Sequence, residues 1–302
     1  MAYMKQVILL HNPKAGDEDH FKSDLMRAIE KEGYRCTYYL IKKDERWKDQ
    51  IDEADIVVVA GGDGTVRKVV KELFEKGIAK RKATLALLPM GTANNLSKTL
   101  LLNKETSFEN HVNAWKNGEY QRFDMGTIAY DGNADFFLEG AGYGIFPSLI
   151  QTMDKIDLSQ LETTDDQLKL ALENLYKIIQ TAEAHLYTIR ADDKTYEDRY
   201  LLLEVMNIPS IGPNLTLAPA AQIDDGYLDL VTISEKEREA FALHVKKITK
   251  GEATSFDFQT IRAKRFEIRS TNKTIHIDDK CVSTSNGSLT IEVREHILDF
   301  LS

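Results

Sequence analysis

The sequence predicts two domains, an α/β domain built on a parallel sheet and then a mostly antiparallel, β-sandwich-like domain. Up to about residue 120, short apolar runs alternate with amphipathic segments, which is typical of βαβ units. Beyond that point, closely spaced strand-like runs are joined by turn residues, which favours antiparallel pairing. We therefore expect domains at 1–122 and 123–291, with residues 292–302 as a candidate to complete the first domain.

Four apolar runs of the first part predict parallel strands, and three amphipathic segments predict helices. Helices cover a parallel sheet on both faces, so its strands read as continuous apolar runs. The predicted strands are Val7–Leu10, Cys36–Ile41, Ile56–Ala60 and Thr84–Leu88, and the predicted helices are Phe21–Lys31, Val66–Lys76 and Phe108–Lys116. Ligands of such sheets bind at the carboxyl ends of the strands, which makes the loops there the candidates for function.

The second part contains many strand-like runs and fewer helices. Turn residues such as DGN at 131–133 separate neighbouring runs, as in β-hairpins. The predicted strands are Phe123–Tyr130, Ala134–Glu139, Leu186–Arg190, Arg199–Asn207, Tyr227–Ile233, Phe266–Arg269, Thr274–Ile277 and Ser288–Val293. The predicted helices lie at about 167–182 and 235–249.

Composition restricts the class of protein. The net charge of −9 over 302 residues argues against general attraction to nucleic acid. Two basic runs, Lys76–Lys82 and Arg262–Arg269, are candidates to dock on an anionic membrane, with ordinary solvated surface as the alternative. Cys36 and Cys281 cannot build a disulfide framework and match no metal motif, which favours a cytoplasmic protein. Because no apolar stretch approaches the about 18 residues of a membrane span, we expect any membrane association to be peripheral.

The run VVVAGGDGTVRKVV at 57–70 joins a predicted strand to a predicted helix. Gly61, Gly62 and Gly64 allow backbone N–H groups to approach a ligand closely. Together with the N-terminus of the helix, they predict a phosphate cradle. Asp63 would repel a phosphate unless a divalent cation or a proton donor lies between them, so it suggests Mg²⁺ chemistry or base catalysis. The alternative is a tight turn in which Asp63 or Thr65 caps the helix.

Two further loops repeat this pattern. In LPMGTANN, Gly91 provides a turn, and Thr92 and Asn94 provide polar groups before a helix-like segment. In HNPKAG, Asn12 and Lys14 follow the first predicted strand. Because the carboxyl ends of parallel strands meet at one edge of a sheet, we expect all three loops to lie together.

The three loop sequences, in this order, resemble the diacylglycerol kinase catalytic-domain family, which includes bacterial lipid kinases and the sphingosine and ceramide kinases. The stretch IPSIGPNLTLAPAAQIDDGYLDL at 208–230 resembles the Pro-x-Ala and Asp-Gly-x-Leu elements of that family. GGDGT alone is shared with NAD kinases and phosphofructokinases, and the PMGTANN segment makes the likeness specific. The resemblance implies a fold of the NAD kinase and diacylglycerol kinase type.

The resemblance also implies a reaction, namely ATP-dependent phosphorylation of a lipid hydroxyl in a cleft between the two domains. It implies that Asn12, Lys14, Gly61–Thr65, Gly91–Thr92 and Asn94 hold the nucleotide. The lipid would be met at a membrane surface and would need apolar walls. Phe146, Leu149 and Ile150 are candidates for such walls, with ordinary core positions as the alternative. Which lipid is phosphorylated stays open, as does a homodimer.

The predicted catalytic and metal-binding residues are all aspartates. By the resemblance, Asp63 would organise phosphate-bound Mg²⁺, and Asp225 matches a segment that holds a structural Mg²⁺ in some bacterial relatives, with a hairpin turn as the alternative. In IHIDDKCV, Asp278 stands at the Asp of the family's Asp-Gly-Glu, while Asp279 replaces the Gly and Lys280 replaces the Glu. We predict Asp278 as the base and Asp63 as the second choice.

Two other functions stay open at this point. The departures at Asp279 and Lys280 are compatible with a catalytically weak protein that keeps the fold and binds a nucleotide or a lipid. An NAD kinase-like enzyme is a further alternative, although the Asn-Glu dipeptide expected of its dinucleotide-binding region does not occur in the sequence. The seven histidines show no metal spacing, and we expect His11 and His276 to be structural.

Overall fold

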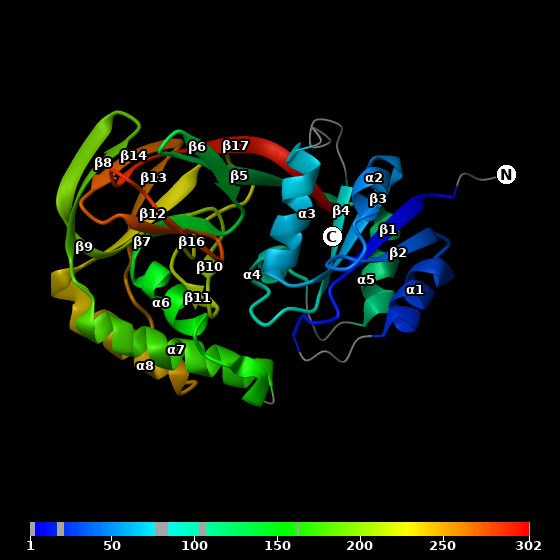
Figure 1. Ribbon diagram of the computed structural model, residues 1–302, viewed down its shortest axis with the longest axis horizontal. Coiled ribbons are helices and arrows are strands. Elements are labelled where there is room, and N and C mark those ends of the chain that lie inside the picture. Colours follow the sequence, from blue (N-terminus) through cyan, green and yellow to red (C-terminus); the bar gives the residue numbers. More distant parts are fainter. Residues whose placement is uncertain (1–3, 17–20, 76–83, 103–106, 162, 302) are drawn as a thin grey trace. The chain divides into compact units, whose positions relative to one another are not determined.

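The computed structural model describes residues 4–16, 21–75, 84–102, 107–161 and 163–301. The chain divides into two compact units: unit 1 comprises residues 1–123 with 296–302, and unit 2 comprises residues 124–295 (Figure 1). The predicted class of fold is confirmed, because unit 1 is an α/β unit with a parallel sheet and unit 2 is a β-sandwich-like unit. Among the described residues, no helix is long and apolar enough to cross a membrane.

Unit 1 contains a parallel sheet with the order β4-β3-β1-β2. At its β4 edge, Asp299–Leu301 of the last strand adds a further parallel pairing, with Asp299 opposite Thr84. The strands are β1 (Gln6–His11), β2 (Arg35–Leu40), β3 (Ile56–Gly61), β4 (Thr84–Pro89) and the end of β17 (Ser288–Leu301), and the helices are α1 (Lys22–Lys31), α2 (Trp47–Gln50), α3 (Asp63–Glu75), α4 (Asn95–Thr99) and α5 (Phe108–Ala114).

Helices cover both faces of this sheet (Figure 1). The α1 helix buries Leu25, Ala28 and Ile29, whose spacing places them on one helix face. They pack with the α5 residue Val112 and with one face of the strands. The α3 helix lies on the opposite face (Figure 1). The inner strands β1, β3 and β4 are consequently buried along nearly their whole length, which explains their continuous apolar sequences, whereas the edge strand β2 is partly exposed.

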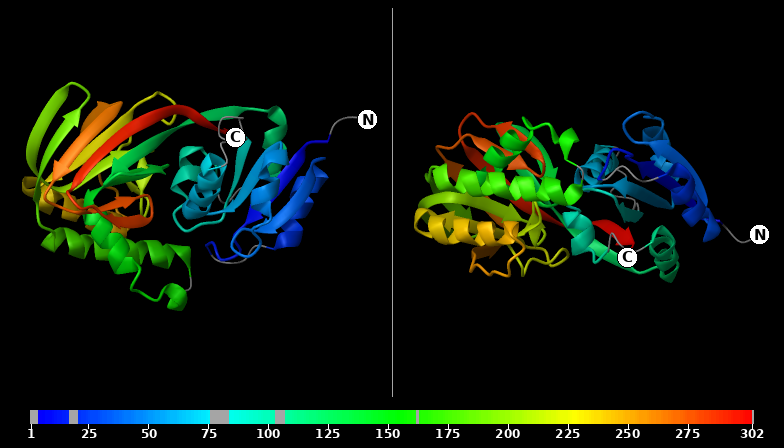
Figure 2. Two further views of the ribbon diagram at one scale, coloured as in Figure 1. Left: turned by 45° about the horizontal axis from the view of Figure 1, so that its top comes forward. Right: turned by 90° about the horizontal axis from the view of Figure 1, so that it is seen from below.

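Unit 2 is built from antiparallel strands, with three helices against one outer face (Figure 2). The long β9 strand pairs with β8 through its first half and with both β7 and β12 through its second half. The strands are β5 (Tyr120–Tyr130), β6 (Asn133–Phe137), β7 (Gly140–Gly144), β8 (His185–Ala191), β9 (Lys194–Met206), β10 (Ser210–Ile211), β11 (Leu215–Thr216), β12 (Leu228–Ser234), β13 (Gln259–Ala263), β14 (Arg265–Ser270), β15 (Thr274–Ile277), β16 (Lys280–Ser283) and the first part of β17, and the helices are α6 (Ile145–Met153), α7 (Thr164–Thr181) and α8 (Arg238–Thr249).

The β9 strand separates two apolar cores of unit 2. Leu203 and Val205 face a core enclosed by the strands. Leu202 and Met206 point the other way, into the core under α6, α7 and α8. Because side chains alternate along a strand, Glu204 shares this helix-covered face. Its side chain is fully buried.

Phe146 and Leu149 are members of the helix-covered core, with exposed fractions of 2% and 4%. Their position therefore favours the alternative of ordinary core residues over walls of an open acyl cleft. Ile150 on the same helix is half-buried.

The sequence patterns did not predict β7, β10, β11, β13, β16, α2 or α6. The sequence of β7 is GAGYG, and glycine weakens the pattern by which a strand is recognised. The structure shows why glycines stand there. A Cβ on Gly142 would overlap the carbonyl oxygen of Leu203 and would lie 2.9 Å from the Cα of Glu204. Glycine thus lets β7 pair with β9 while the Glu204 side chain crosses beneath it.

Replacing Gly142 by alanine is expected to destabilise unit 2. The added methyl group has no room against the β9 backbone, and overpacking of this kind costs about 1–3 kcal/mol. Urea denaturation followed by circular dichroism would measure the loss. Gly251→Ala is the matched control: its Cβ would meet nothing within 4 Å, and its φ of 71° adds only a backbone cost of about 1 kcal/mol. Equal stability of Gly142→Ala and the wild type would contradict the predicted overlap.

Candidate functional site

The loops after β1, β3 and β4 are tied to one another by hydrogen bonds. The backbone N–H of Asn12 donates to the carbonyl of Ala60 over 2.9 Å, and its side-chain Nδ2 donates to Thr65 Oγ1 over 3.1 Å. The N–H of Met90 donates to the carbonyl of Gly61 over 3.1 Å. The three loops predicted to lie together therefore form one connected edge of the unit 1 sheet.

Glycines allow the backbones of these loops to touch. A Cβ added to Gly62 would lie 2.8 Å from the Cα of Gly91, which is closer than carbon atoms pack. A Cβ added to Gly16 would overlap the carbonyl oxygen of Met90, and Gly16 also has a φ of 65°. No other residue type fits at these positions without displacing a neighbouring loop.

Asn94 closes the loop after β4 on itself. Its Oδ1 accepts from the N–H of Gly91 over 2.7 Å, and its Nδ2 donates to the carbonyl of Gly91 over 2.6 Å. The φ of Asn94 is 53°, a conformation that asparagine tolerates better than most residues. The Asn94 side chain is buried, whereas Thr92 is half-buried and Lys14 and Gly64 are exposed.

Asp63 is the first residue of α3 and binds the start of α4. Its two carboxylate oxygens accept from the N–H groups of Asn95, over 3.0 Å, and Leu96, over 3.1 Å. Burial raises the pKa of Asp63, and these two N–H groups oppose that effect. Asp63 thus joins the loop after β3 to the loop after β4.

The residues around Asp63 supply only some of the ligands that a metal ion needs. Each carboxylate oxygen has lone pairs left after one hydrogen bond. The described residues contain no group of three or more His, Cys, Asp or Glu side chains that could hold a metal ion. A magnesium ion at Asp63 would therefore take most of its ligands from water and from phosphate, which is how Mg²⁺ is usually held beside nucleotides.

Asp278, in unit 2, occupies the turn between β15 and β16. Its carboxylate accepts from the N–H groups of Leu138, Glu139 and Gly140 at 2.9 to 3.3 Å. Its own N–H donates to the carbonyl of Gly140. The residue is 7% exposed and has a φ of 51°. Three backbone donors hold this carboxylate in one orientation, while the neighbouring Lys280 is exposed.

A buried Glu–His pair supports the Asp278 turn. His276 Nε2 lies 2.8 Å from Glu204 Oε2, and its Nδ1 lies 2.8 Å from the carbonyl oxygen of Asp278. Burial lowers the pKa of His276, but Glu204 and Asp278 together outweigh it, so that the pKa is raised overall. Burial also raises the pKa of Glu204, and His276 opposes this. The sequence analysis did not single out Glu204; a glutamate inside the apolar run LLLEVM was the available signal.

Asp225 lies in the turn before β12 and already pairs with a cationic side chain of the protein. Its Oδ2 pairs with Arg262, and its Oδ1 accepts from the N–H of Tyr227 over 3.0 Å. The neighbouring Asp124 is fully buried, and its Oδ2 accepts from the N–H of Gly226 over 2.7 Å. A metal ion at Asp225 would have to displace Arg262 or share the carboxylate with it.

The basic run 262–269 is largely neutralised by acidic neighbours. Besides the pair of Arg262, Lys264 lies 2.7 Å from Glu295, and Arg265 lies 3.0 Å from Glu267. This favours the alternative of a solvated surface over a dock for an anionic membrane. The other basic run, 76–82, lies outside the described residues.

Comparison with known proteins gives matches over both units. Residues 6–128 match the family model described as the diacylglycerol kinase catalytic domain, and residues 155–299 match the YegS C-terminal NAD kinase beta sandwich-like domain. The chain is 24% identical to a diacylglycerol kinase of Bacillus subtilis over 82% of this chain and 80% of that protein. It is 24% identical to a diacylglycerol kinase of Staphylococcus saprophyticus over 97% of this chain and 94% of that protein.

Solved structures show the same fold. A putative diacylglycerol kinase from Bacillus anthracis superposes with a TM-score of 0.75 at 21% identity, covering 100% of this chain and 96% of that one. An NAD kinase from Archaeoglobus fulgidus in complex with ATP superposes with a TM-score of 0.54 at 14% identity, covering 98% and 93%. At these identities the likeness concerns the fold.

The Glu204–His276 pair predicts a dependence of stability on pH. The pKa of His276 is raised in the folded state, so its contribution is fully present below the unfolded value of about 6.5. That contribution is lost as pH rises through the folded pKa. We expect the free energy of unfolding of the wild type to fall as pH rises above about 6.5, and to fall less in Glu204→Gln, which removes the charge that raises the pKa.

Urea titrations at several pH values would measure this slope. Glu109→Gln, which removes an exposed carboxylate on α5, is the control for loss of one negative charge. An identical slope in the wild type and in Glu204→Gln would show that the pair does not bind the additional proton.

Proposed function

Because the chain belongs to the diacylglycerol kinase catalytic-domain family, and is therefore a lipid kinase, we propose that it transfers the γ-phosphoryl group of ATP to a hydroxyl of a diacylglycerol-like lipid alcohol. The observation that carries this proposal is the connected edge formed by the three glycine-containing loops of unit 1. Phosphoryl transfer asks a protein mainly for positioning and charge neutralisation, and closely packed loops rich in backbone N–H groups suit that task.

The nucleotide phosphates are proposed to lie against this edge. Gly64 lies in the first turn of the 13-residue helix α3, where negative charge is stabilised, while the N–H groups of Thr65 and Val66 in that turn already donate to the carbonyl of Gly62. Lys14 adds an exposed cation. Asn12 and Asn94 are committed to contacts between and within the loops, so we infer that they shape the cradle and support Gly91 and Thr92.

Mg²⁺ fits this arrangement if Asp63 supplies one ligand, and when bound it would neutralise the charge that builds up on the phosphoryl group. The Asp63 carboxylate has a second task, because it fixes the start of α4. It therefore holds the loop after β4 in register with the loop after β3 whether or not the ion is present.

Asp278 is proposed as the acceptor of the proton of the lipid hydroxyl. A base must be oriented as well as ionised, and the three N–H groups of residues 138–140 orient this carboxylate. His276 holds the backbone of the same turn, which makes it a positioning residue. Asp63 stays the second choice for the base.

We further propose that the protein is cytoplasmic and meets its lipid peripherally at a membrane surface. The proposed acceptor is a lipid, which the protein would meet at a membrane, and this supports the proposal. The homodimer predicted from the sequence stays a prediction.

One observation favours a second function, that of a catalytically weak protein that binds a nucleotide or a lipid. The Asp278 carboxylate is 7% exposed and is occupied by three backbone donors. Lys280 adds a cation where the family carries a glutamate. These features leave little of the carboxylate for an incoming hydroxyl.

Transfer of labelled phosphate from ATP to lipids in mixed micelles tests the proposed activity. We expect a labelled product with diacylglycerol or a related lipid alcohol, and none with NAD. Asp63→Asn should reduce turnover at least about 100-fold, as losses of transition-state charge stabilisation do, but should lower stability by only about 1 kcal/mol, the typical value of one lost cap. Phosphorylated NAD without phosphorylated lipid would contradict the proposal, and parallel losses of turnover and stability in Asp63→Asn would reduce that residue to a structural role.

Asp278→Asn separates the lipid kinase from the weak binding protein. The amide keeps the shape of the side chain, so nucleotide should still raise the melting temperature of the variant. Lipid phosphorylation should fall about 100-fold or more, within the range for loss of a general base. Lys280→Ala, at an exposed neighbouring position, is the control for disturbance of the turn. No phosphorylation of any lipid by the wild type, together with a nucleotide-dependent melting temperature, would favour the binding protein.

A further inference from the structure

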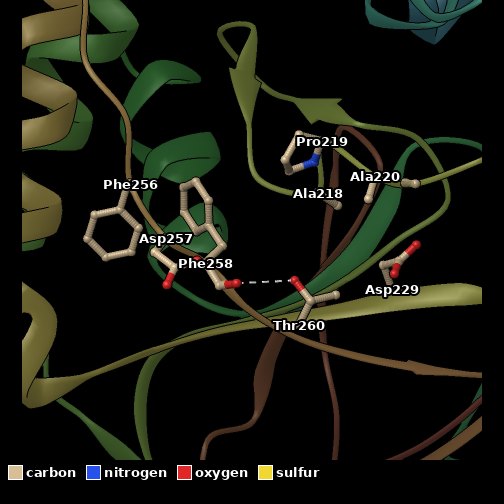
Figure 3. A pocket seen from close by; sticks show the side chains of 9 residues that line it. Ala218, Pro219, Ala220, Asp229, Phe256, Asp257, Phe258 and Thr260 are labelled. Atoms are coloured by element: carbon tan, nitrogen blue, oxygen red, sulfur yellow. Dashed lines mark hydrogen bonds between the residues drawn. The ribbon is translucent and has the colours of Figure 1, made fainter.

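Unit 2 contains a pocket that is lined in part by the stretch 208–230 and by none of the residues placed in the candidate site above. Its volume is about 240 Å³, which is below the about 300–1,000 Å³ of sites for drug-sized ligands and suits a small molecule. It opens between the segment after β11, the segment after α8, and the paired strands β12 and β13. The lining residues are Ala218, Pro219, Ala220, Ala221, Asp229, Phe256, Asp257, Phe258 and Thr260 (Figure 3).

One carboxylate lines this pocket without an ion pair, that of Asp229, although Arg262, which pairs with Asp225, stands opposite it in the β12–β13 pairing. Asp229 belongs to β12, whose neighbours Leu228 and Leu230 face the core enclosed by the strands. Asp229 therefore faces the other way, on the same side as the buried Val231. It is 7% exposed, and burial alone raises its pKa. Among the described residues, no hydrogen bond or ion pair is recorded for its carboxylate.

An isolated buried carboxylate is costly, so it calls for a physical explanation. Other buried acids of unit 2 have partners: Asp124 accepts from Gly226, and Glu204 pairs with His276. Asp229 lies instead at the wall of an open pocket (Figure 3). A cation entering that pocket would supply the missing partner.

The opposite wall of the pocket is aromatic. In Figure 3, Phe256 and Phe258 lie on the side away from Asp229, with Ala218 and Pro219 between the two. The two rings are 4.8 Å apart at their centroids and pack against the helix-covered core. Aromatic rings attract cations through their faces and bury apolar groups. The wall therefore suits a molecule that combines a positive charge with an apolar body.

We propose that this pocket binds a small organic ammonium ion, with the ammonium group at Asp229 and the apolar body against Phe256 and Phe258. An inorganic cation would gain nothing from the aromatic and alanine walls, and an anion would be repelled by Asp229 and by the exposed Asp257. The site shares no residue with the three loops of unit 1 or with the Asp278 turn. The proposal therefore does not rest on the proposed lipid phosphorylation.

Benzylamine and benzyl alcohol form a matched pair of probes, because they have the same apolar body and differ in charge at neutral pH. Isothermal titration of the full chain should show benzylamine binding at least about tenfold more tightly than benzyl alcohol, as a buried charge-assisted hydrogen bond predicts. Equal binding of the two probes, or binding of neither, would overturn the proposal.

Three substitutions locate the selectivity. Asp229→Asn keeps the shape of the side chain and removes a buried charge, so the variant should fold, and its preference for the amine should disappear. Asp257→Asn, at an exposed lining position, should leave the preference intact. Phe258→Ala should weaken both probes to a similar degree. A preference that survives in Asp229→Asn, or that disappears in Asp257→Asn, would contradict the assignment to Asp229.

Lipid headgroups and free amines can both carry an ammonium group. Competition between vesicles and benzylamine distinguishes these two kinds of ligand. Phosphatidylethanolamine in a neutral carrier lipid should displace benzylamine if the pocket takes headgroups, whereas the carrier lipid alone should not. If neither vesicle displaces benzylamine, the ligand is a free amine. Displacement by vesicles that also persists in Asp229→Asn would overturn the site, because it would place the competition elsewhere.

Discussion

The backbone contact between Gly62 and Gly91 is the constraint on which the candidate nucleotide site depends. It brings the loop after β3 and the loop after β4 closer than any side chain permits. Asp63, which follows β3, accepts hydrogen bonds from the start of α4. Asn12, which follows β1, donates a hydrogen bond to Thr65. Because each contact fixes two loops at once, the donors of all three loops are placed before any ligand arrives, and such preorganisation is what charge stabilisation requires.

A comparable device operates in unit 2, where glycines make room for polar groups. Gly140 and Gly142 of β7 lie against the side chain of Glu204, which could not otherwise cross the helix-covered core. Glu204 in turn holds His276, and His276 holds the backbone carbonyl of Asp278. The orientation of one carboxylate at a turn therefore traces back to the missing side chains of a neighbouring strand. A buried hydrogen-bond network of this kind stabilises a structure only when each of its polar groups has a partner.

The fold class and the meeting of the three loops could be predicted from the sequence, because both follow from local patterns: apolar runs, helix periodicity and glycines at strand ends. The partners of the polar side chains could not. Asp63 meets Asn95, and Asp278 meets Leu138, across 32 and 140 positions of sequence, and no local rule pairs residues at such separations. The strand β7 was missed for a related reason, since its glycines are explained by distant residues of β9, namely Leu201, Leu203 and Glu204. The roles of the predicted site residues remain hypotheses.

Two aspartates of unit 2, equally buried at 7% exposure, differ in what surrounds their carboxylates. Asp278 has three backbone N–H groups, so its negative charge is already stabilised by the fold. Asp229 has only the walls of a pocket, and burial raises its pKa without an opposing group. A charge without a partner contributes nothing to folding, and replacing it by an apolar residue would remove the cost. A buried carboxylate in this situation is better explained by a ligand than by packing, and the aromatic wall opposite determines which kind of ligand fits.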